Sequence, residues 1–488
     1  MAALKLIEIP FYKNGQHYFN LIKHLPYPVW LDSGRPKAEF GRFDIITARP
    51  SILFVSSNNS TEVTDFEFTQ SGKDDKAPDP DPENTAPLIE AKTKQQVFDS
   101  NSDSPFNILR ESMDSITVID NQDIPFTGGL IGYFAYTLSN YLDFLPAREA
   151  SIESIPDMHV GLYLWSFIQD HEQKRSFLAI HPDCPEILEL EAKFFAEQTS
   201  SVIESHANTF NINELKSNFD VNSYNSAFMK IQDYLAAGDC YQVNFAQRFE
   251  AKYQGDPSDA YLRLREVLPA PYSSFLGLKD GAILSHSPEQ FLKVQNQHVR
   301  TQPIKGTSRR HNNPALDKES ASKLQASTKD RSENLMIVDL MRNDLGKNCR
   351  SGSVTAKSLF ELKSYANVHH LVSTIEGELK ASSSAIELFR DCFPGGSVTG
   401  APKTRAMAII QELETVDRSV YCGSIAYISA NNQMDSSITI RTLVCDRETI
   451  YCWGGGGIVA DSTASAEYQE SLDKIQILLD TLKQRKIA

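Results

Sequence analysis

Short apolar runs separated by turn residues fill the first two hundred positions of the chain, and longer stretches with helical periodicity fill much of the rest. Alternating apolar and polar residues predict strands, whereas apolar residues spaced three or four apart predict helices. Strands are expected at 46–48, 51–55, 159–165 and 176–180, with a glycine-containing apolar strand at 126–136. A helix is expected at 187–196.

The C-terminal half alternates strands with longer helices. The pattern predicts helices at 224–237, 317–345 and 463–483, and a further helix that begins near Pro402. Residues 421–461 are expected to form three strands, with turns at Asn431-Asn432 and Asp446-Arg447. Strands and crossing helices in one chain of this size place the fold in the α/β or α+β class.

Two polar segments interrupt the pattern. Residues 71–87 are rich in Pro and Asp and almost free of apolar side chains, which predicts a solvated loop or linker. Residues 200–222 form the main break in composition. We therefore expect an N-terminal region at 1–200 and a second region at 223–482 that carries the chemistry.

Composition narrows the class of protein. The chain has 488 residues, of which 41% are hydrophobic, and a formal net charge of −15. Nucleic-acid and anionic-membrane surfaces need clustered Lys and Arg, so neither partner is expected, whereas an anionic small molecule would fit a cleft lined by a few cations. The sequence shows no signal peptide, no apolar run long enough to span a membrane, and seven cysteines without a C-x-x-C pair. These features predict a soluble cytoplasmic protein with free thiols.

The last predicted helix places three charged side chains on one face. Glu467, Glu470 and Lys474 follow one another at intervals of three and four residues, so they share this face. A solvated Glu–Lys face would explain the pattern by itself. However, four consecutive glycines at 454–457 end the preceding strand, and such a backbone suits close contact with a ligand.

A third carboxylate lies in the helix predicted at 317–345. Glu333 precedes an apolar stretch, where an unpaired carboxylate would be costly. Together with Glu467 and Glu470 it would form an all-oxygen site with open positions, which suits Mg²⁺. The segment 395–403 has the glycine spacing of a phosphate loop but lacks its Lys-Ser/Thr pair, so we exclude a nucleoside-triphosphate site and expect its N–H groups to suit a carboxylate.

Three further residues are candidates for binding or catalysis. Lys305 lies in the run Pro-Ile-Lys-Gly-Thr, and a neutral amine held there is a nucleophile. Arg441 is expected inside a strand at 437–444, where it needs an anionic partner, either a substrate carboxylate or a core Asp. His370 is the third. Taken singly, these residues could equally be a surface lysine, a salt-bridged arginine and a core histidine.

Six strings follow one another in the C-terminal half: GDCYQVNFAQRF (238–249), SPEQF (287–291), PIKGT (303–307), DRSENLMIVDLMRNDLG (330–346), FPGGSVTGAPKTRAM (393–407) and GGGIVADSTASAEYQESLDK (455–474). In this order they resemble the chorismate-utilising enzymes, over about 224–478. LDSG (31–34), GRFDIITARP (41–50) and PFTGGLIGYFAY (125–136) are similar to the regulatory portion of that family, although Thr137 stands where the family usually has Asp.

The resemblance implies a large interleaved β-sandwich of two subdomains flanked by helices, similar to anthranilate-forming members. The resemblance also indicates which of the family's reactions this chain catalyses. Members that add water have a lysine base where this chain has Gln242, which implies an ammonia-using enzyme. Anthranilate-forming members usually have Ala where this chain has Lys305, whereas lysine is typical of members that make 4-amino-4-deoxychorismate for 4-aminobenzoate and folate.

The implied mechanism uses Lys305 as nucleophile and Glu289 as acid. Glu333 and Glu470, with Glu467 through water, would hold Mg²⁺ against the ring carboxylate. Neutral Lys305 would attack ring carbon 2 while Glu289 protonates the departing 4-hydroxyl, and ammonia would then add at carbon 4 and expel the lysine. These roles require a lowered pKa for Lys305 and a raised pKa for Glu289. The substrate contacts implied by the family are Gln242, Thr307, His370, Thr399, Tyr421, Arg441, Gly455 and Lys474.

Partners and alternatives follow from the same resemblance. Because the sequence has no glutaminase motif, ammonia is expected from a separate glutamine amidotransferase subunit, and a separate lyase would remove pyruvate. A tryptophan pocket is implied at Ser33, Arg42, Phe43 and Asp44. Two alternatives stay open: an anthranilate-forming member, which shares every motif except the lysine, and a non-catalytic chorismate- or tryptophan-binding protein.

Overall fold

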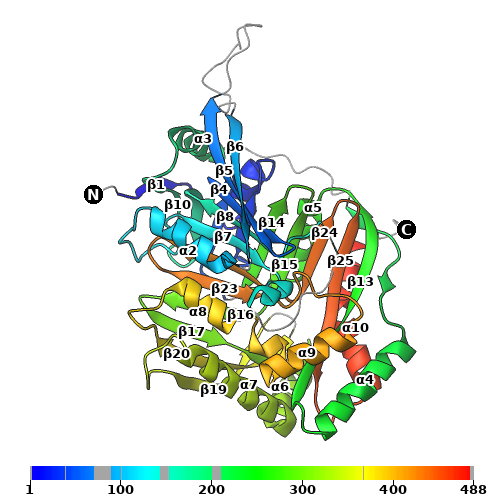
Figure 1. The fold of residues 1–488 in the computed structure, drawn as a ribbon. Coiled ribbons are helices and arrows are strands. Elements are labelled where there is room, and N and C mark those ends of the chain that lie inside the picture. Colours follow the sequence, from blue (N-terminus) through cyan, green and yellow to red (C-terminus); the bar gives the residue numbers. More distant parts are fainter. Residues whose placement is uncertain are drawn as a thin grey trace, which may run out of the picture.

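Two large antiparallel sheets each combine a block of strands from the N-terminal half of the chain with a block from the C-terminal half (Figure 1). The computed structural model describes residues 3–38, 40–70, 89–100, 102–142, 152, 154–200, 210–365 and 368–483. The first sheet runs in the order β1 (Lys5–Ile9), β10 (Arg175–Ile180), β9 (Trp165–Asp170), β3 (Phe43–Thr47), β2 (Val29–Asp32), β14 (Tyr272–Leu278), β15 (Gly281–Ser287), β24 (Thr442–Asp446), β25 (Thr449–Ile458), β13 (Gln242–Gln254) and β11 (Asn211–Ile212), and β12 (Lys216–Ser217) and β21 (Gly400–Ala401) also pair with β13.

The second sheet is built in the same mixed way. Its order is β18 (Ile304–Arg309), β20 (Val368–Glu378), β17 (His298–Gln302), β16 (Gln290–Gln295), β23 (Met434–Ile438), β22 (Ser424–Ser429), β7 (Gly129–Phe134), β8 (Met158–Tyr163), β4 (Ile52–Ser57), β5 (Ser60–Gln70) and β6 (Ile89–Asp99), and β19 (Thr355–Ser364) pairs with β20. The β5–β6 ribbon projects from the body at the top of Figure 1.

Helices flank the sheets: α1 (Gln16–Ile22), α2 (Pro105–Ser115), α3 (Glu186–Glu197), α4 (Val221–Ala236), α5 (Pro257–Val267), α6 (Pro314–Ala326), α7 (Thr328–Gly346), α8 (Ala385–Cys392), α9 (Lys403–Leu413) and α10 (Ala464–Leu482). The main apolar core lies between the sheets, because it packs Ile283 and Val444 of the first against Ile131 and Leu292 of the second. A further core packs α1, α3, α5 and α10 against the first sheet.

The predicted class is confirmed, since helices flank an interleaved pair of antiparallel sheets. The helices predicted at 187–196, 224–237 and 463–483 are present as α3, α4 and α10, and α9 begins beside Pro402 as expected. The segment predicted as a linker at 71–87 lies outside the described residues. Because the two sheets draw strands from both halves, the fold places N-terminal and C-terminal residues side by side.

The single helix predicted at 317–345 is wrong, because α6 and α7 meet at Ser327. This serine has an extended backbone, with φ −64° and ψ 109°, and its hydroxyl oxygen accepts the N–H of Asp330. A serine that caps the following turn satisfies a free N–H group there, which favours a new helix start over continuation. After the break, α7 packs against β18, β19 and β20.

The prediction of three strands at 421–461 is also wrong, since β22, β23, β24 and β25 lie in this segment. Arg441 was expected inside a strand but lies between β23 and β24. Its φ of 51° is in the left-handed region, which interrupts an extended backbone. The guanidinium is thereby directed by a bend of the chain and not by the alternation of a strand.

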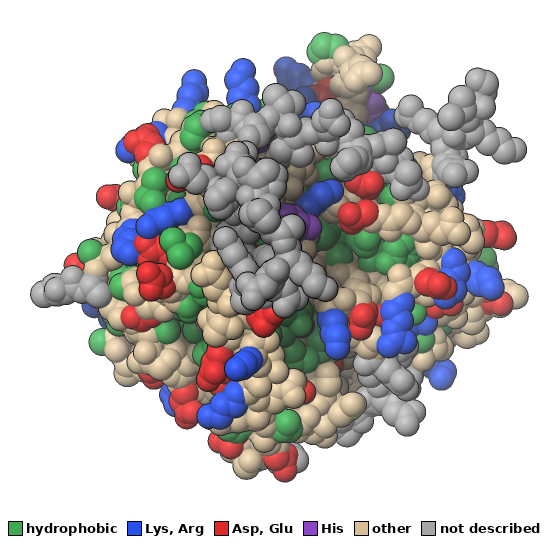
Figure 2. Space-filling model, turned by 90° about the horizontal axis from the view of Figure 1, so that it is seen from above, with side chains coloured by type: hydrophobic (Ala, Val, Ile, Leu, Met, Phe, Trp, Pro, Cys, Tyr) green, Lys and Arg blue, Asp and Glu red, His purple; other side chains and the backbone are tan. Residues whose placement is uncertain are grey.

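Two expectations about the whole chain can be compared with the structure. All seven cysteines are unpaired, as predicted. No helix in the described part of the chain is both long enough and apolar enough to cross a membrane. On the face seen in Figure 2, basic and acidic side chains are interspersed, and a hollow opens near the middle.

Candidate active site

The glycines of β25 bring its backbone close to β13 and α10. A Cβ on Gly455 would lie 2.6 Å from the carbonyl oxygen of Phe245, and one on Gly457 would lie 1.9 Å from Nε2 of Gln242. A Cβ on Gly456 would lie 3.1 Å from Glu467 Oε2 and 3.3 Å from an oxygen of Glu470. Side chains are therefore excluded from this surface, which two carboxylates and an amide border.

Helix α10 presents its charged face to this glycine segment. Lys474 Nζ donates a hydrogen bond of 3.0 Å to the carbonyl oxygen of Gly455 and lies 2.6 Å from a carboxylate oxygen of Glu470. Burial acts to raise the pKa of Glu470, but Lys474 outweighs it, so the pKa lies below its usual value. The helix is thus tied to the strand through Lys474, and Glu470 is held ionised.

The negative charges of Glu333 and Glu467 are balanced less well by nearby cations than the charge of Glu470. Burial raises the pKa of Glu467, and the neighbouring charge of Glu470 adds to this effect, while the hydroxyl of Ser462 donates a hydrogen bond of 2.7 Å to it. Burial also raises the pKa of Glu333, against the charges of Lys305 and Lys329. Buried carboxylates that raise one another's pKa form a site that a cation would stabilise.

These three carboxylates fit the donor set that Mg²⁺ prefers, because all their ligand atoms are oxygens. Among the described residues, no three Asp, Glu, His or Cys side chains are grouped closely enough to hold a metal ion as they stand. Lysines occupy part of this space instead: Lys329 Nζ lies 3.9 Å from Glu333, and Lys474 contacts Glu470. A metal would therefore have to displace these ammonium groups from the carboxylates.

Lys305, on β18, lies at the centre of the charged groups. Its Nζ donates a hydrogen bond of 2.7 Å to the carbonyl oxygen of Ser397. Burial lowers the pKa of Lys305, although the carboxylates of Glu289 and Glu333 act in the opposite direction. An amine with a lowered pKa is more often neutral at a given pH, which is the form that attacks carbon.

Glu289 lies in the short link between β15 and β16 and is only 4% exposed. Burial raises the pKa of its carboxyl group above the usual value, against a hydrogen bond from Ser397 and the charge of Lys305. The shift favours the protonated form that can donate a proton. Ser397 thus contacts both members of the pair, through its carbonyl oxygen on Lys305 and its hydroxyl on Glu289.

Arg441 has no carboxylate partner among the described residues. Its guanidinium makes no ion pair or hydrogen bond in the part of the chain that the structure describes, and burial alone lowers its pKa. The alternative of a structural salt bridge therefore finds no support here. A half-buried, unpaired guanidinium is a suitable partner for an incoming carboxylate.

His370, on β20, lies near Arg441. Its Nδ1 shares a hydrogen bond of 2.9 Å with the hydroxyl of Thr307, while its Nε2 is buried without a protein partner among the residues described. Burial, followed by the charge of Arg441, lowers its pKa to about 3. The imidazole is therefore neutral near neutral pH and has one nitrogen free for a ligand.

Three further predicted substrate contacts differ in whether they have a polar atom free for a ligand. Gln242 begins β13 with a buried Oε1 that lacks a protein partner in the described chain. The hydroxyl of Thr399 is already used, because it donates to the carbonyl oxygens of Gly395 and Gly396 at 3.2 and 3.3 Å. Tyr421 stacks parallel to Trp453, with ring centroids 6.1 Å apart. Gln242 is thus the one of these three with a free polar atom.

An arginine that sequence reasoning missed braces the site. Arg418 is 1% exposed and donates to Glu414, to the carbonyl oxygen of Val398 at 2.9 Å and to that of Asn244 at 2.6 Å. It thereby ties the loop before α9 to β13. Ser397 was missed as well. Both roles depend on contacts across distant segments, which local patterns do not reveal.

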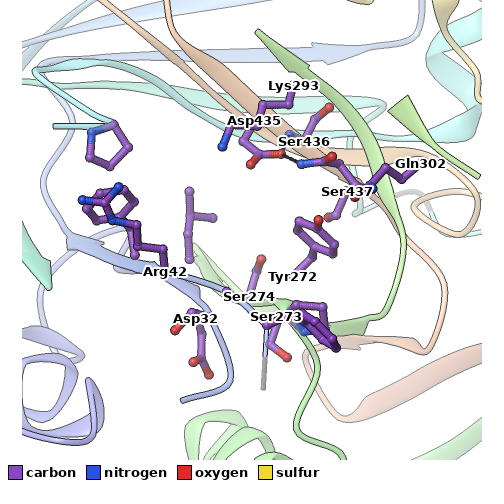
Figure 3. Close-up of a pocket in the computed structure, with 18 of the residues that line it drawn as sticks. Asp32, Arg42, Tyr272, Ser273, Ser274, Lys293, Gln302, Asp435, Ser436 and Ser437 are labelled. Atoms are coloured by element: carbon purple, nitrogen blue, oxygen red, sulfur yellow. Dashed lines mark hydrogen bonds between the residues drawn. The ribbon is translucent and has the colours of Figure 1, made fainter. Parts of the chain in front are cut away.

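The residues predicted for tryptophan border a separate cavity between the sheets. Ser33, Arg42 and Phe43 line it, and its volume is about 480 Å³. Asp44 is not part of the lining; it lies behind the wall, where it accepts hydrogen bonds from the N–H and hydroxyl of Ser33 at 2.8 and 2.6 Å. Figure 3 shows Arg42 and Asp32 on one side of this cavity and Lys293, Asp435 and Gln302 on the other.

Known proteins share both this fold and these motifs. The chain belongs to the family described as chorismate binding enzyme, whose sequence pattern matches residues 70–480, so the predicted family is confirmed. Aminodeoxychorismate synthase component 1 of Escherichia coli (strain K12) is 42% identical over 472 residues, which cover 96% of each chain.

Two further similar proteins are anthranilate synthases. Anthranilate synthase component 1 of Aquifex aeolicus (strain VF5) is 32% identical over 394 residues, covering 78% of this chain and 79% of that relative. The crystal structure of anthranilate synthase component I from Streptococcus pneumoniae TIGR4 superposes with a TM-score of 0.75 and 28% identity, covering 90% of this chain and 92% of that one.

Proposed function

We propose that this chain is an aminodeoxychorismate synthase component 1, a cytoplasmic enzyme that converts chorismate and ammonia into 4-amino-4-deoxychorismate for 4-aminobenzoate and folate synthesis. The near full-length likeness to the Escherichia coli protein of that name supports the proposal. The structural observation that carries it is the pairing of a half-buried amine, Lys305, with a buried acid, Glu289, because each acts on the pKa of the other. Opposite pKa shifts allow a neutral nucleophile and a protonated acid to coexist.

The proposed chemistry has two displacements. Lys305 Nζ forms a bond to ring carbon 2 while the bond from carbon 4 to its hydroxyl breaks, and Glu289 supplies the proton that lets this group leave as water. Ammonia then bonds to carbon 4, and the bond between carbon 2 and Lys305 breaks. The nitrogen therefore replaces the hydroxyl, and the lysine returns to its starting state.

Other residues of the site hold the substrate. Arg441 would bind one substrate carboxylate, because its half-buried guanidinium has no protein partner in the described chain. His370 would contact the reacting hydroxyl region through its free Nε2, and Gln242 through its free Oε1. Thr307, Thr399, Tyr421, Gly455 and Lys474 complete the proposed substrate contacts.

The carboxylates of Glu333, Glu467 and Glu470 would hold Mg²⁺. The metal would supply positive charge to the ring carboxylate and increase the electrophilicity of the ring. The raised pKa of Glu333 and of Glu467 supports this assignment, because burial makes their negative charges costly without a cation. The lysines that now lie among these carboxylates would turn toward the substrate.

Ammonia would come from a second subunit. Relatives are named component 1, which implies a partner component, and we propose that the partner is a glutamine amidotransferase. We also propose that tryptophan binds in the cavity of Figure 3 at the end lined by Ser33, Arg42 and Phe43, where the guanidinium of Arg42 lies 4.5 Å from the Phe43 ring centroid. An indole would fit this cationic and aromatic surface.

Anthranilate synthesis is the second candidate, favoured by the 32% identity to anthranilate synthase component 1 of Aquifex aeolicus. The two candidates differ in the role of Lys305, since only the first uses a nucleophilic amine. A non-catalytic binder has no need of an amine and an acid with opposite pKa shifts.

Mass analysis of the product separates these functions. Purified chain, chorismate, Mg²⁺ and ammonium, without a partner subunit, should give a product that keeps the enolpyruvyl group and carries an amine in place of the hydroxyl. Anthranilate with released pyruvate would establish the second candidate, and chorismate binding without turnover would establish the binder.

The role of Lys305 is tested in the same assay. Lys305→Ala should abolish the covalent adduct and lower the rate by about 100-fold or more, since the nucleophile is lost. Lys323→Ala is a matched control, because Lys323 lies on the exposed surface of α6 and pairs with Glu319 of the same helix. A Lys305→Ala rate equal to that of the parent would contradict the nucleophile role.

A further inference from the structure

The far end of the cavity in Figure 3 carries a concentration of positive charge. Lys293 on β16, Arg300 on β17 and Lys363 on β19 line it, with Asp435 on β23 as the neighbouring acid of the wall. Lys293 lies directly opposite both Arg300 and Asp435 in the strand register. Directly opposite residues place their side chains on one face of a sheet, so these groups form a row.

The charges of Lys293 and Arg300 act on the carboxyl group of Asp435, but the hydrogen bonds of this end leave most of the cationic donors unused. Oδ1 of Asp435 accepts from Gln290 Nε2 at 2.8 Å and from the N–H of Ser436 at 2.9 Å. Arg300, which lines the cavity, donates through Nε to Gln290 Oε1 at 3.2 Å, and its terminal N–H groups make no hydrogen bond within the described chain. Neither Lys293 nor Lys363 makes a hydrogen bond or ion pair within the described chain. The cavity wall therefore presents unused donors.

Acids outside the wall do not neutralise these donors directly. Glu376 is opposite Arg300 in the register, but its carboxylate lies 3.5 Å from His298. Glu361 acts on Lys363 only through its charge. Burial lowers the pKa of the Lys363 ammonium, and Arg300 contributes to the shift in the same direction. An anion placed between these cations would relieve both effects.

We propose that this cationic end is a second ligand subsite, which binds the carboxylate of a small ring carboxylate. The terminal edge of Arg300 can form a bidentate pair with a carboxylate, and Lys363 can add a charge-assisted hydrogen bond. Tyr272 and Tyr365 also line the cavity and offer apolar faces for a ring. The cavity volume of about 480 Å³ lies within the range typical of small-molecule sites, which is about 300–1,000 Å³.

This subsite is distinct from the candidate active site. Lys305 and Glu289 do not line the cavity, although their neighbours Ile304 and Gln290 do. The wall between the two spaces is thus a single strand thick at these positions. A ligand here would lie next to β18, which carries Lys305, and next to the start of β16, which follows Glu289 directly.

Isothermal titration of the full chain with 4-aminobenzoate tests the subsite. Arg300→Gln and Lys363→Met should each weaken binding by about tenfold, because each removes one charge-assisted contact. Arg441→Gln, in the active site, should leave the affinity for this probe unchanged, and so should a saturating concentration of L-tryptophan. Chorismate turnover should be unaffected in Arg300→Gln and Lys363→Met.

Several results would overturn the proposal. No binding at millimolar 4-aminobenzoate would do so, as would unchanged affinity in both cavity variants or loss of affinity in Arg441→Gln. Competition by L-tryptophan would mean that one ligand spans the whole cavity. Lys293→Met removes a third positive charge from the same wall. The melting temperatures of the three cavity variants then show whether weaker binding comes from the lost charge or from a loss of folding.

Discussion

Burial in the site raises the free energy of some ionised side chains. Glu467 is 5% exposed, and burial together with the charge of Glu470 raises its pKa. The folded protein therefore binds the Glu467 proton more tightly than the unfolded chain does. The stability that this proton contributes is fully present below the unfolded pKa and is lost as pH rises through the folded pKa. Ionised Glu467 is thus a destabilising residue unless a cation approaches it.

Glu467→Gln should stabilise the metal-free protein at about pH 8 by on the order of 1 kcal/mol, because it removes a buried charge and keeps an acceptor for Ser462. The advantage should shrink toward about pH 5, where the parent carboxyl takes up its proton. Mg²⁺ should raise the melting temperature of the parent more than that of the variant. Differential scanning calorimetry with chelator or Mg²⁺ measures both effects.

Asp473→Asn is the control for this change, because Asp473 lies exposed on the same helix and accepts from Gln469. It should alter neither the pH dependence nor the response to Mg²⁺. An equal Mg²⁺ response in Glu467→Gln and the parent would show that Glu467 does not take part in metal binding.

The pairing of β25 with β13 sets the position of the Gln242 side chain. Gly457 of β25 lies opposite Asn244 of β13, and the space that a Cβ on Gly457 would occupy is filled by the side chain of Gln242. The absence of a side chain on Gly457 therefore makes room for the side chain of Gln242 on the neighbouring strand. This dependence belongs to the strand pair, since neither residue alone determines it.

Gly457→Ala should displace the Gln242 side chain, because the new Cβ would lie 1.9 Å from Nε2. We expect a loss of about tenfold or more in kcat/KM, since a misplaced group in a packed site changes transition-state contacts. In a Gln242→Ala background the same glycine substitution should have little further effect. Steady-state kinetics of the four proteins form a double-mutant cycle, and additive losses would contradict the coupling.

Element boundaries show where sequence reasoning succeeds. Long amphipathic helices such as α4 and α10 were predicted because periodicity over many residues outweighs local competition. The break at Ser327 was missed, since a serine within helix-forming residues acts as a cap only when the tertiary structure redirects the chain. The bend at Arg441 was missed for a related reason. Its left-handed φ is imposed by the surrounding structure, and no glycine at this position indicates it in the sequence.

At the scale of the whole molecule, the pairing of distant strands could not be predicted from periodicity. β2 pairs with β14, and β7 pairs with β22, so each sheet closes only when both halves of the chain are present. Alternation predicts that a segment is a strand but does not identify its neighbour. The motifs identified Lys305, Glu289 and the carboxylates, whereas the brace of Arg418 needed the assembled sheets.

The shared sheets predict that the two halves unfold together. The chain has three tryptophans, and Trp30 and Trp165 report on the N-terminal half while Trp453 reports on the C-terminal half. Urea titrations of Trp453→Phe and of the Trp30→Phe/Trp165→Phe double variant should each give one fluorescence transition that coincides with loss of far-UV circular dichroism in the same protein. Coincidence is expected because unfolding either half removes edge partners and core contacts from the other. A fluorescence midpoint that departs from the circular dichroism midpoint in either variant would instead mean that one half retains its structure alone.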